Sequence, residues 1–265
     1  NGDPLNGNMP RVTYEGYGEM SDVCIKRKIR NRLLDAGENI FVQSDDKCID
    51  KCKSLKARAD ANEAFGAELK KGKKADAQRG YEIACKEWMD VRSFGQVFAF
   101  KGSELSLGIR GPVSVQPAFS VDPIDITSMQ ITKSVNSEDK EGKSSDTMGM
   151  KHRVDFGVYI LKGSINVQLS EKTGFTEEDA EKIKEAIRTL FVNDSSSARP
   201  DGSMVMHKLY WWKHNCKIGQ YSSHKVHNSI EIKKKEGVRN PRKIEDYEII
   251  CHELPGLAVE EYEGL

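Results

Sequence analysis

Apolar residues recur at helical spacing directly after Ser21. Ile25, Ile29 and Leu33 lie four residues apart and form one stripe of a helix. Ser21 is suited to the N-cap position, and Gly37 is suited to the end of the helix. The pattern therefore predicts a helix that starts after Ser21 and runs to about residue 36.

The next fifty residues consist of a short apolar segment followed by a long charged one. Residues 39–43 (NIFVQ) fit a short strand, and residues 45–91 are helical in character. Gly72, inside the sequence KKGKK, is expected to interrupt the helices. We interpret residues 45–91 as a helical insertion in or beside the core.

From residue 97 onward the apolar period changes from helical to two, which is typical of strands. Strands are predicted over residues 113–122 and 124–135, and the segment 153–169 is also strand-like. The segment 136–146 (NSEDKEGKSSD) has no apolar anchor and is predicted to be a polar, mobile loop.

The C-terminal third contains one strongly patterned helix. Thr176 is an N-cap candidate, three acidic residues follow it, and residues 177–192 carry an apolar stripe. Further strands are predicted over residues 204–213, 229–233 and 247–251. The order of helices and strands predicts an α+β fold with helices on one face of a sheet.

The charges are balanced in number but not in position. The chain has 265 residues with 41 Lys and Arg against 41 Asp and Glu. Five cations and one acid lie in residues 21–32, whereas residues 244–265 hold seven acids and no Lys or Arg. A net charge of zero argues weakly against nucleic-acid binding, but this segregation permits a basic face.

The six cysteines are scattered, which favours reduced thiols and a cytoplasmic protein. Apolar runs are short, so no membrane span is expected. The chain opens with the turn sequence Asn1-Gly2-Asp3-Pro4 in place of an initiator Met. We expect a further strand upstream of that turn.

A metal site has limited support. His207, His214, Cys216, His224 and His227 lie within 21 residues, but their spacing matches no standard zinc module. The pair CIDKC at residues 48–52 is four residues apart on a predicted helix and has no nearby histidine. We therefore predict that the protein holds no metal and no other cofactor.

Catalysis has equally little support. The chain contains no GxSxG, HExxH or P-loop motif. His152 beside Lys151, or the carboxylate of Asp3, would suit a nuclease, but isolated residues of these types are usually structural. A non-enzymatic function is the prediction.

Several basic segments favour binding to RNA phosphates. On the predicted helix, Lys26 and Arg30 lie on one edge of the apolar stripe, while Arg27 points more nearly away. The segments 92–95 (RSFG) and 108–112 (GIRGP) each combine an arginine with glycine, which allows close approach of the backbone. A third segment, 194–199 (DSSSAR), is similar in kind.

Taken together and in order, these segments resemble a known family. The motifs NGDPLNGNMPR, SDVCIKRKIRN, DVRSFGQV, GIRGPVSV, DTMGMKHRVDFGVY, LSEKTGFTEED and SSSAR with HKLYWWKHN are similar to the backbone subunit of type I-C CRISPR Cascade complexes, in the Cas-seven family. The resemblance covers nearly the whole chain and is weakest over residues 45–84.

The resemblance implies a modified ferredoxin-like (RRM-like) palm with a helical insertion and a β-hairpin thumb. The palm would comprise residues 1–44, 92–116 and 154–265, the insertion residues 45–91, and the thumb residues 117–153. One departure from a typical RRM is that no RNP motif is present. Trp211 and Trp212 are consecutive, so they should face opposite sides of a strand, one in the core and one exposed.

The implied function is to hold CRISPR RNA without catalysis, stacking head to tail with further copies and joining the other Cascade subunits while the guide pairs with target DNA. The implied RNA-binding residues are Arg11, Ser21, Lys26, Arg27, Arg30, Arg92, Ser93, Phe94, Gly95, Arg110, Gly111, Met148, Lys151, His152, Ser197 and Arg199. Met148 and Met150 flank Gly149, and their thioethers are candidates to wedge against displaced bases.

Two other functions stay open from the sequence. One is an endoribonuclease subunit that cleaves target RNA, and the other is a general single-stranded RNA-binding module that does not polymerise. For the stacked assembly, we expect the acidic C-terminal segment, including Glu260, Glu261 and Glu263, to steer docking onto a surface rich in lysine such as residues 70–74.

Overall fold

The computed structural model describes residues 2–135 and 148–265. The predicted loop over residues 136–146 lies outside the described residues. The chain divides into two compact units, which we name by their content. The sheet unit comprises Asn1–Asp22, Pro117–Lys162 and Ile230–His252, and the core unit comprises Val23–Gln116, Gly163–Ser229 and Glu253–Leu265.

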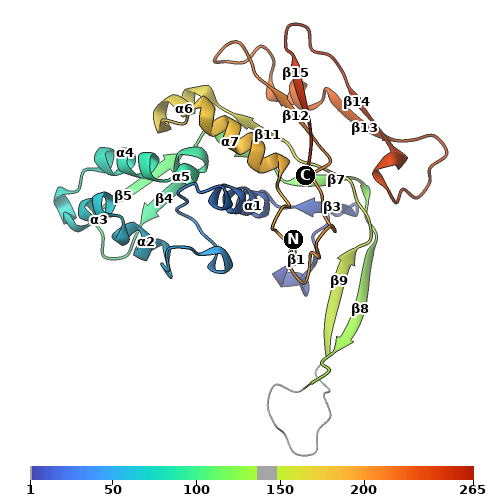
Figure 1. The fold of residues 1–265 in the computed structure, drawn as a ribbon, viewed down its shortest axis with the longest axis horizontal. Coiled ribbons are helices and arrows are strands. Elements are labelled where there is room, and N and C mark those ends of the chain that lie inside the picture. Colours follow the sequence, from blue (N-terminus) through green and yellow to red (C-terminus); the bar gives the residue numbers. More distant parts are fainter. Residues whose placement is uncertain (1, 136–147) are drawn as a thin grey trace, which may run out of the picture. The chain divides into compact units, whose positions relative to one another are not determined.

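The sheet unit consists of strands in small antiparallel sheets (Figure 1). A three-stranded sheet has the order β10-β7-β3, and the pairs β1–β2, β8–β9 and β13–β14 form two-stranded sheets. The strands are β1 (Gly2–Asp3), β2 (Met9–Pro10), β3 (Tyr17–Met20), β7 (Ala118–Pro123), β8 (Ile126–Thr132), β9 (Met148–Val154), β10 (Tyr159–Ile160), β13 (Ile230–Lys234) and β14 (Tyr247–Cys251). Short 3-10 turns occur at Pro4–Asn6 and Ile244–Asp246.

The core unit combines helices with three two-stranded antiparallel ladders, which are β4–β5, β6–β11 and β12–β15. Its helices are α1 (Asp22–Asp35, whose first residue belongs to the sheet unit), α2 (Leu55–Ala61), α3 (Glu63–Lys70), α4 (Ala77–Glu87), α5 (Met89–Phe94), α6 (Val167–Thr173), α7 (Glu177–Arg188) and α8 (Ser223–His227). Its strands are β4 (Gly95–Ala99), β5 (Ser106–Arg110), β6 (Val113–Val115), β11 (Gly163–Ile165), β12 (Lys208–Trp212) and β15 (Val259–Glu263). The mixed α+β character predicted from the sequence is confirmed.

Helices α1 and α7 agree with their sequence patterns. Ile25, Ile29 and Leu33 are buried on α1, and Gly37 follows the helix with a positive φ of 87°. Thr176 forms a capping box at the start of α7, as its position predicted. The helix ends at Arg188, earlier than the predicted residue 192.

The helices α2 to α5 pack against the β4–β5 ladder around an aromatic cluster (Figure 1). The ring centroids of Phe41 and Trp88 are 4.7 Å apart, and those of Phe65 and Phe98 are 4.8 Å apart. All four side chains are at most 2% exposed. The helical insertion thus contributes directly to a core built by residues on both sides of it. As predicted, α3 ends before Gly72, which has a positive φ of 58°.

Two local predictions were wrong. Residues 39–43 form no strand, because the N–H groups of Phe41 and Val42 donate to the Asp90 carboxylate at 2.7 Å and 3.1 Å and so have no strand partner. Val167 does not continue a strand but begins α6, because the Asn166 side chain caps that helix by accepting from the Leu169 N–H.

A third difference concerns the C-terminus, where the acidic segment 259–263 was not predicted as a strand. It forms β15 and pairs with β12 over five positions. On β12, Trp211 and Trp212 do face opposite ways, but both are half-buried, contrary to the predicted core and exposed pair. The ring centroids of Trp212 and Tyr210 are 6.2 Å apart. The Lys184 ammonium lies over the Trp211 ring. No helix of the described part is both long and apolar enough to cross a bilayer.

Candidate nucleic-acid interface

The basic edge of α1 is engaged in contacts within the core unit. The Arg30 Nε donates to the Asp90 carboxylate at 2.9 Å, and its guanidinium lies 5.0 Å from the centroid of the Phe94 ring. The Arg27 Nη1 donates to the Val42 carbonyl at 2.6 Å. Both arginines thereby tie α1 to neighbouring segments. A phosphate role for them stays a prediction and would have to use their remaining N–H groups, whereas Lys26 is half-exposed on the same helix.

Another cation of α1, Lys28, is buried and links the loop 194–199 to the helix. Its ammonium pairs with the Asp194 carboxylate and lies 5.4 Å from the centroid of the Phe191 ring. The Arg199 Nε binds the same carboxylate at 3.1 Å. Two cations therefore share one acid, which leaves a local excess of positive charge. Ser197 is exposed on this loop, where the sequence placed an RNA contact.

Arg92, another predicted RNA-binding residue, forms a bidentate ion pair with Asp179. Its Nε and Nη2 donate to the two carboxylate oxygens at 2.9 Å and 2.7 Å. Asp179 also accepts from the Thr176 N–H in the capping box. Burial favours the neutral acid, but Arg92 and the Thr176 N–H favour the carboxylate and hold the pKa of Asp179 below its usual range.

This ion pair predicts a specific pH dependence. Because the pKa of Asp179 is depressed in the folded state, the carboxylate stabilises the fold above the ordinary Asp value of about 3.9, and this contribution is lost as the pH falls through the depressed value. Asp179→Asn should therefore be less stable than the unsubstituted protein at pH 7, with the difference shrinking below about pH 4. Urea denaturation at several pH values measures this, with the exposed Asp201→Asn as control. A difference that is constant from neutral to acid pH would contradict the prediction.

The glycines of the two predicted phosphate loops have a structural explanation. A Cβ on Gly95 would lie 2.2 Å from the Ile109 carbonyl oxygen, and one on Gly111 would lie 2.2 Å from that of Ser93. Gly95 also has a positive φ of 81°. The backbones of the two segments are therefore in direct contact, and a side chain at either glycine would push them apart. Next to this backbone contact, the Arg110 side chain is exposed.

Ser93 and Phe94 are not equally placed for RNA. Ser93 is fully buried, and its hydroxyl donates to the Met89 carbonyl at 2.6 Å. Phe94 is half-buried beneath Arg30. A direct RNA contact by either residue stays a prediction, and for Ser93 it would require the end of α5 to open.

The β8–β9 hairpin carries two exposed residues of the predicted set, Met148 and Lys151 (Figure 1). Seven residue pairs join the strands, from Ile126↔Val154 to Thr132↔Met148. Met148 is 64% and Met150 57% exposed on one face. Lys151 is exposed on the opposite face, and His152 bonds to the Ser128 hydroxyl at 2.8 Å.

Each face of this hairpin presents apolar and polar side chains together. Met129 and Ile131 are 40% and 48% exposed and share the face of Lys151. Isolated exposed apolar residues are ordinary, but four along one two-stranded ribbon indicate a contact surface. Thioether and aliphatic side chains can pack on flat bases, and Lys151 can neutralise a phosphate. The hairpin is the part of the predicted site with the best geometry for RNA.

The two remaining predicted residues lie near the start of the chain. Arg11 approaches the Asp3 carboxylate at 3.5 Å, while its Nε is buried without a hydrogen-bond partner. An RNA contact by Arg11 stays a prediction, because this unpaired nitrogen is closed off from solvent. Ser21 is half-buried directly before α1.

Comparison with known proteins decides the family. The family model described as CRISPR-associated protein Cas7 matches residues 1–252. The chain belongs to the Cas7 family. A curated relative, the CRISPR-associated protein Cas7 of Haloferax volcanii, is 22% identical over 215 residues, which cover 74% of this chain. The matched region spans only 61% of that relative's length. A solved structure titled "CRISPR RNA-guided surveillance complex, pre-nicking" contains a chain with 19% identity and a TM-score of 0.47, with 75% of this chain and 69% of that chain covered.

In this Cas7 family member, the histidines and cysteines do not assemble into a metal site. Within residues 2–135 and 148–265, no group of three or more His, Cys, Asp or Glu side chains is arranged to hold a metal. His214 instead accepts the Gln220 N–H at 3.0 Å, and His227 contacts the Gly163 carbonyl at 2.8 Å. His214 thus stabilises a local turn, and His227 links α8 to β11 within the core unit.

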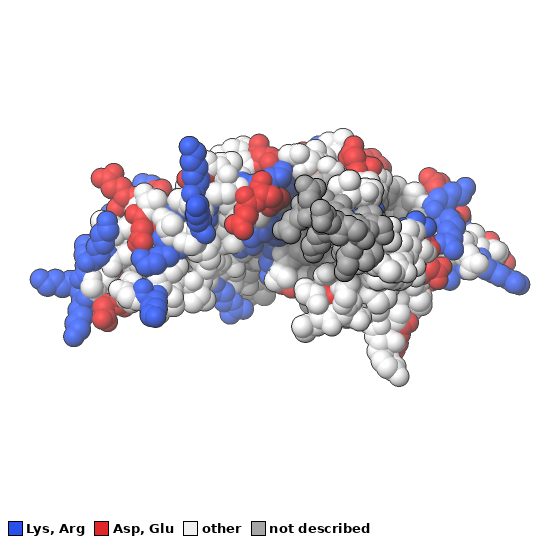
Figure 2. All heavy atoms as spheres, turned by 90° about the horizontal axis from the view of Figure 1, so that it is seen from below, with Lys and Arg blue, Asp and Glu red and all other residues white. Residues whose placement is uncertain are grey.

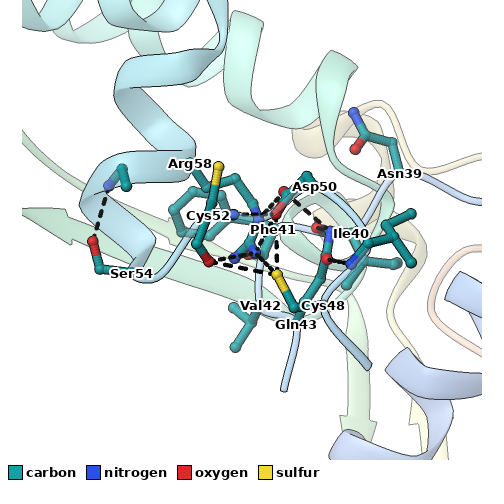
Figure 3. A network of polar contacts seen from close by, with 12 residues as sticks. Asn39, Ile40, Phe41, Val42, Gln43, Cys48, Asp50, Cys52, Ser54 and Arg58 are labelled. Carbon is teal, nitrogen blue, oxygen red and sulfur yellow. Dashed lines mark hydrogen bonds and ion pairs between the residues drawn. The ribbon is translucent and has the colours of Figure 1, made fainter. Parts of the chain in front are cut away.

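Cys48 and Cys52 belong to a polar network around the buried Arg58, shown in Figure 3. They lie in a loop and not on the predicted helix. The Arg58 guanidinium pairs with Asp50 and donates to the Phe41 carbonyl at 2.8 Å. Arg58 is the main reason that the pKa of Asp50 is lowered. The network closes the helical insertion onto residues 40–43, which is a structural role for both cysteines.

Three carboxylates of the acidic C-terminal segment form ion pairs within the Cas7 chain itself. Lys184 pairs with Glu260 at 3.0 Å, and Lys208 pairs with both Glu261 and Glu263. Glu260 also accepts from the Tyr262 hydroxyl, and this bond together with Lys184 lowers the pKa of Glu260. The predicted steering of neighbouring copies stays a prediction, and it would have to compete with these internal ion pairs.

One basic segment of the Cas7 chain was missed by the sequence reasoning. Residues 233–243 (KKKEGVRNPRK) contain six cations against one acid and connect β13 to β14. The signal that could have found it is the run of cations itself.

Proposed function

We propose that this Cas7 family member is a non-catalytic backbone subunit that binds CRISPR RNA in a type I-C surveillance complex of the cytoplasm. Several copies stack head to tail along the guide, contact the other Cascade subunits and present the spacer for pairing with target DNA. The observation that carries the proposal is the match of the Cas7 family model to residues 1–252. The ordered motifs described for the sequence support the type I-C assignment.

The proposed architecture assigns roles to the observed elements. The ferredoxin-like palm comprises residues 1–44, 92–116 and 154–265, the insertion residues 45–91, and the thumb residues 117–153. Exposed cations and apolar side chains on the β8–β9 hairpin support its role as the thumb. Contacts to phosphates and base faces suit a protein that must hold any spacer, because base pairing supplies the specificity.

Reconstitution on RNA tests the proposal. The full chain is mixed with CRISPR RNA and sized by light scattering, with a short RNA that spans less than one binding site as control. Several copies should assemble on the long RNA and none should multimerise on the short one. Assembly that never exceeds one copy on a long RNA would favour the general RNA-binding module. Cleavage of complementary RNA by the assembled protein with Mg²⁺ would overturn the non-catalytic assignment.

Two exposed cations give a mutational test of RNA binding. Arg110→Ala with Lys151→Ala should weaken single-stranded RNA binding to a similar extent for every sequence. The slope of log affinity against log salt should decrease by about 1.4, or about 0.7 for each lost phosphate contact. Fluorescence anisotropy at several salt concentrations measures both.

The matched control for this test is Lys86→Ala with Lys172→Ala, which removes the same charge from two exposed helix positions. Its salt slope should equal that of the unsubstituted protein. An equal loss in both variants would indicate a general charge effect and would contradict the assignment of Arg110 and Lys151.

A further inference from the structure

The connection between β13 and β14 forms a basic arm, which we define as residues 233–243. In Figure 2, Lys and Arg side chains lie at the right of the view with some acidic side chains among them, where Figure 1 places this connection. The arm contains Lys233, Lys234, Lys235, Arg239, Arg242 and Lys243 against the single acid Glu236. None of these residues belongs to the RNA-binding set inferred from the sequence.

The base of the arm is fixed by carboxylates of the same unit. Lys234 pairs with Asp122 at 3.0 Å, and Arg242 pairs with Asp125 at 3.3 Å. The Asp246 carboxylate accepts the N–H of Arg242 at 2.7 Å. This contact is the largest cause of the lowered pKa of Asp246. These contacts thus hold both ends of the arm against its own unit.

Three other cations of the arm keep their positive charge available. Lys235, Arg239 and Lys243 are exposed. Within the described part of the chain, none of the three makes an ion pair. Gly237 turns the arm with a positive φ of 82°. Three cations held on one rooted loop suit a partner with closely and regularly spaced negative charges, because each contact then needs little further ordering.

The composition of the arm identifies the kind of partner. Proteins that hold single strands combine cations with aromatic side chains that stack on bases. The arm has no Phe, Tyr or Trp. A duplex has already stacked its bases and offers one phosphate charge for about every 1.7 Å of its axis. We propose that the basic arm binds the phosphate backbone of double-stranded nucleic acid, independently of sequence. This function goes beyond guide binding and does not depend on it.

The test measures binding of the full chain to a labelled DNA duplex of arbitrary sequence and to a single-stranded RNA of equal length. The arm variant is Lys235→Gln, Arg239→Gln and Lys243→Gln. Its duplex affinity should fall at least about tenfold at low salt, and its salt slope should decrease by about 2.7, from three contacts at about 0.9 each. Its affinity for single-stranded RNA should be unchanged.

The control variant is Lys53→Gln, Lys86→Gln and Lys172→Gln, which removes the same charge at exposed positions of the core unit. It should bind the duplex as the unsubstituted protein does. Circular dichroism confirms that both variants are folded. Unchanged duplex binding by the arm variant, an equal loss in the control, or an equal loss for single-stranded RNA would each overturn the proposal. A protein without any single-stranded RNA binding would refute the guide-binding function while leaving the duplex measurement valid.

Discussion

Replacing Asp90 by alanine is expected to destabilise the protein by about 3–5 kcal/mol. The Asp90 side chain is fully buried and accepts three hydrogen bonds, from the Arg30 Nε and from the N–H groups of Phe41 and Val42. Its removal leaves the largely buried Arg30 without its ion partner and two backbone donors without an acceptor. Urea denaturation followed by tryptophan fluorescence measures the loss, since Trp88 is part of the adjacent core.

The control for this prediction is Asp60→Ala. Asp60 also pairs with a cation, Lys56, but the two side chains are 37% and 50% exposed. An exposed pair of this kind contributes at most about 1 kcal/mol. The prediction fails if Asp90→Ala costs no more than Asp60→Ala, because the buried carboxylate would then not organise residues 39–43.

Shortening the β8–β9 hairpin is expected to reduce RNA affinity about 100-fold, or about 2.8 kcal/mol. The variant replaces residues 129–151 by Asn-Gly, a two-residue hairpin turn that joins the paired positions Ser128 and His152. It removes Lys151 and the exposed apolar side chains of both faces. The fold should persist, because the removed side chains that the structure describes are exposed. RNA titration by anisotropy, with denaturation as the folding check, measures both effects.

A second hairpin variant separates the apolar from the ionic contribution. Met129→Ser, Ile131→Ser, Met148→Ser and Met150→Ser keep the ribbon and its cations. If apolar side chains pack on bases, this variant should lose affinity without any change in the salt slope, because phosphate contacts alone set that slope. Unchanged affinity in both hairpin variants would exclude the hairpin as the thumb.

The local sequence pattern was sufficient to predict the elements whose stabilising residues lie within the element itself. The helices α1 and α7 were predicted because their apolar spacing, caps and terminal charges all lie within one segment. Strand β8 lies within the strand predicted over residues 124–135, whereas β9 was expected only from the thumb hairpin that the family resemblance implied. Residues 39–43 and 259–263 could not be assigned correctly in the same way. The first is held by Asp90 and the second by β12, and neither partner is adjacent in sequence.

The sequence by itself determined the family resemblance, the α+β class and the cations available to an RNA-binding surface. Only the tertiary structure decided which of those cations are occupied. Arg30 meets its acid 60 residues away, and Lys28 meets Asp194 166 residues away. An ion pair depends on distance in space, and charge counts along the chain carry no information about such distances. For this reason Arg27, Lys28 and Arg30 of helix α1 make contacts within the core unit, while the hairpin and the basic arm hold exposed charge.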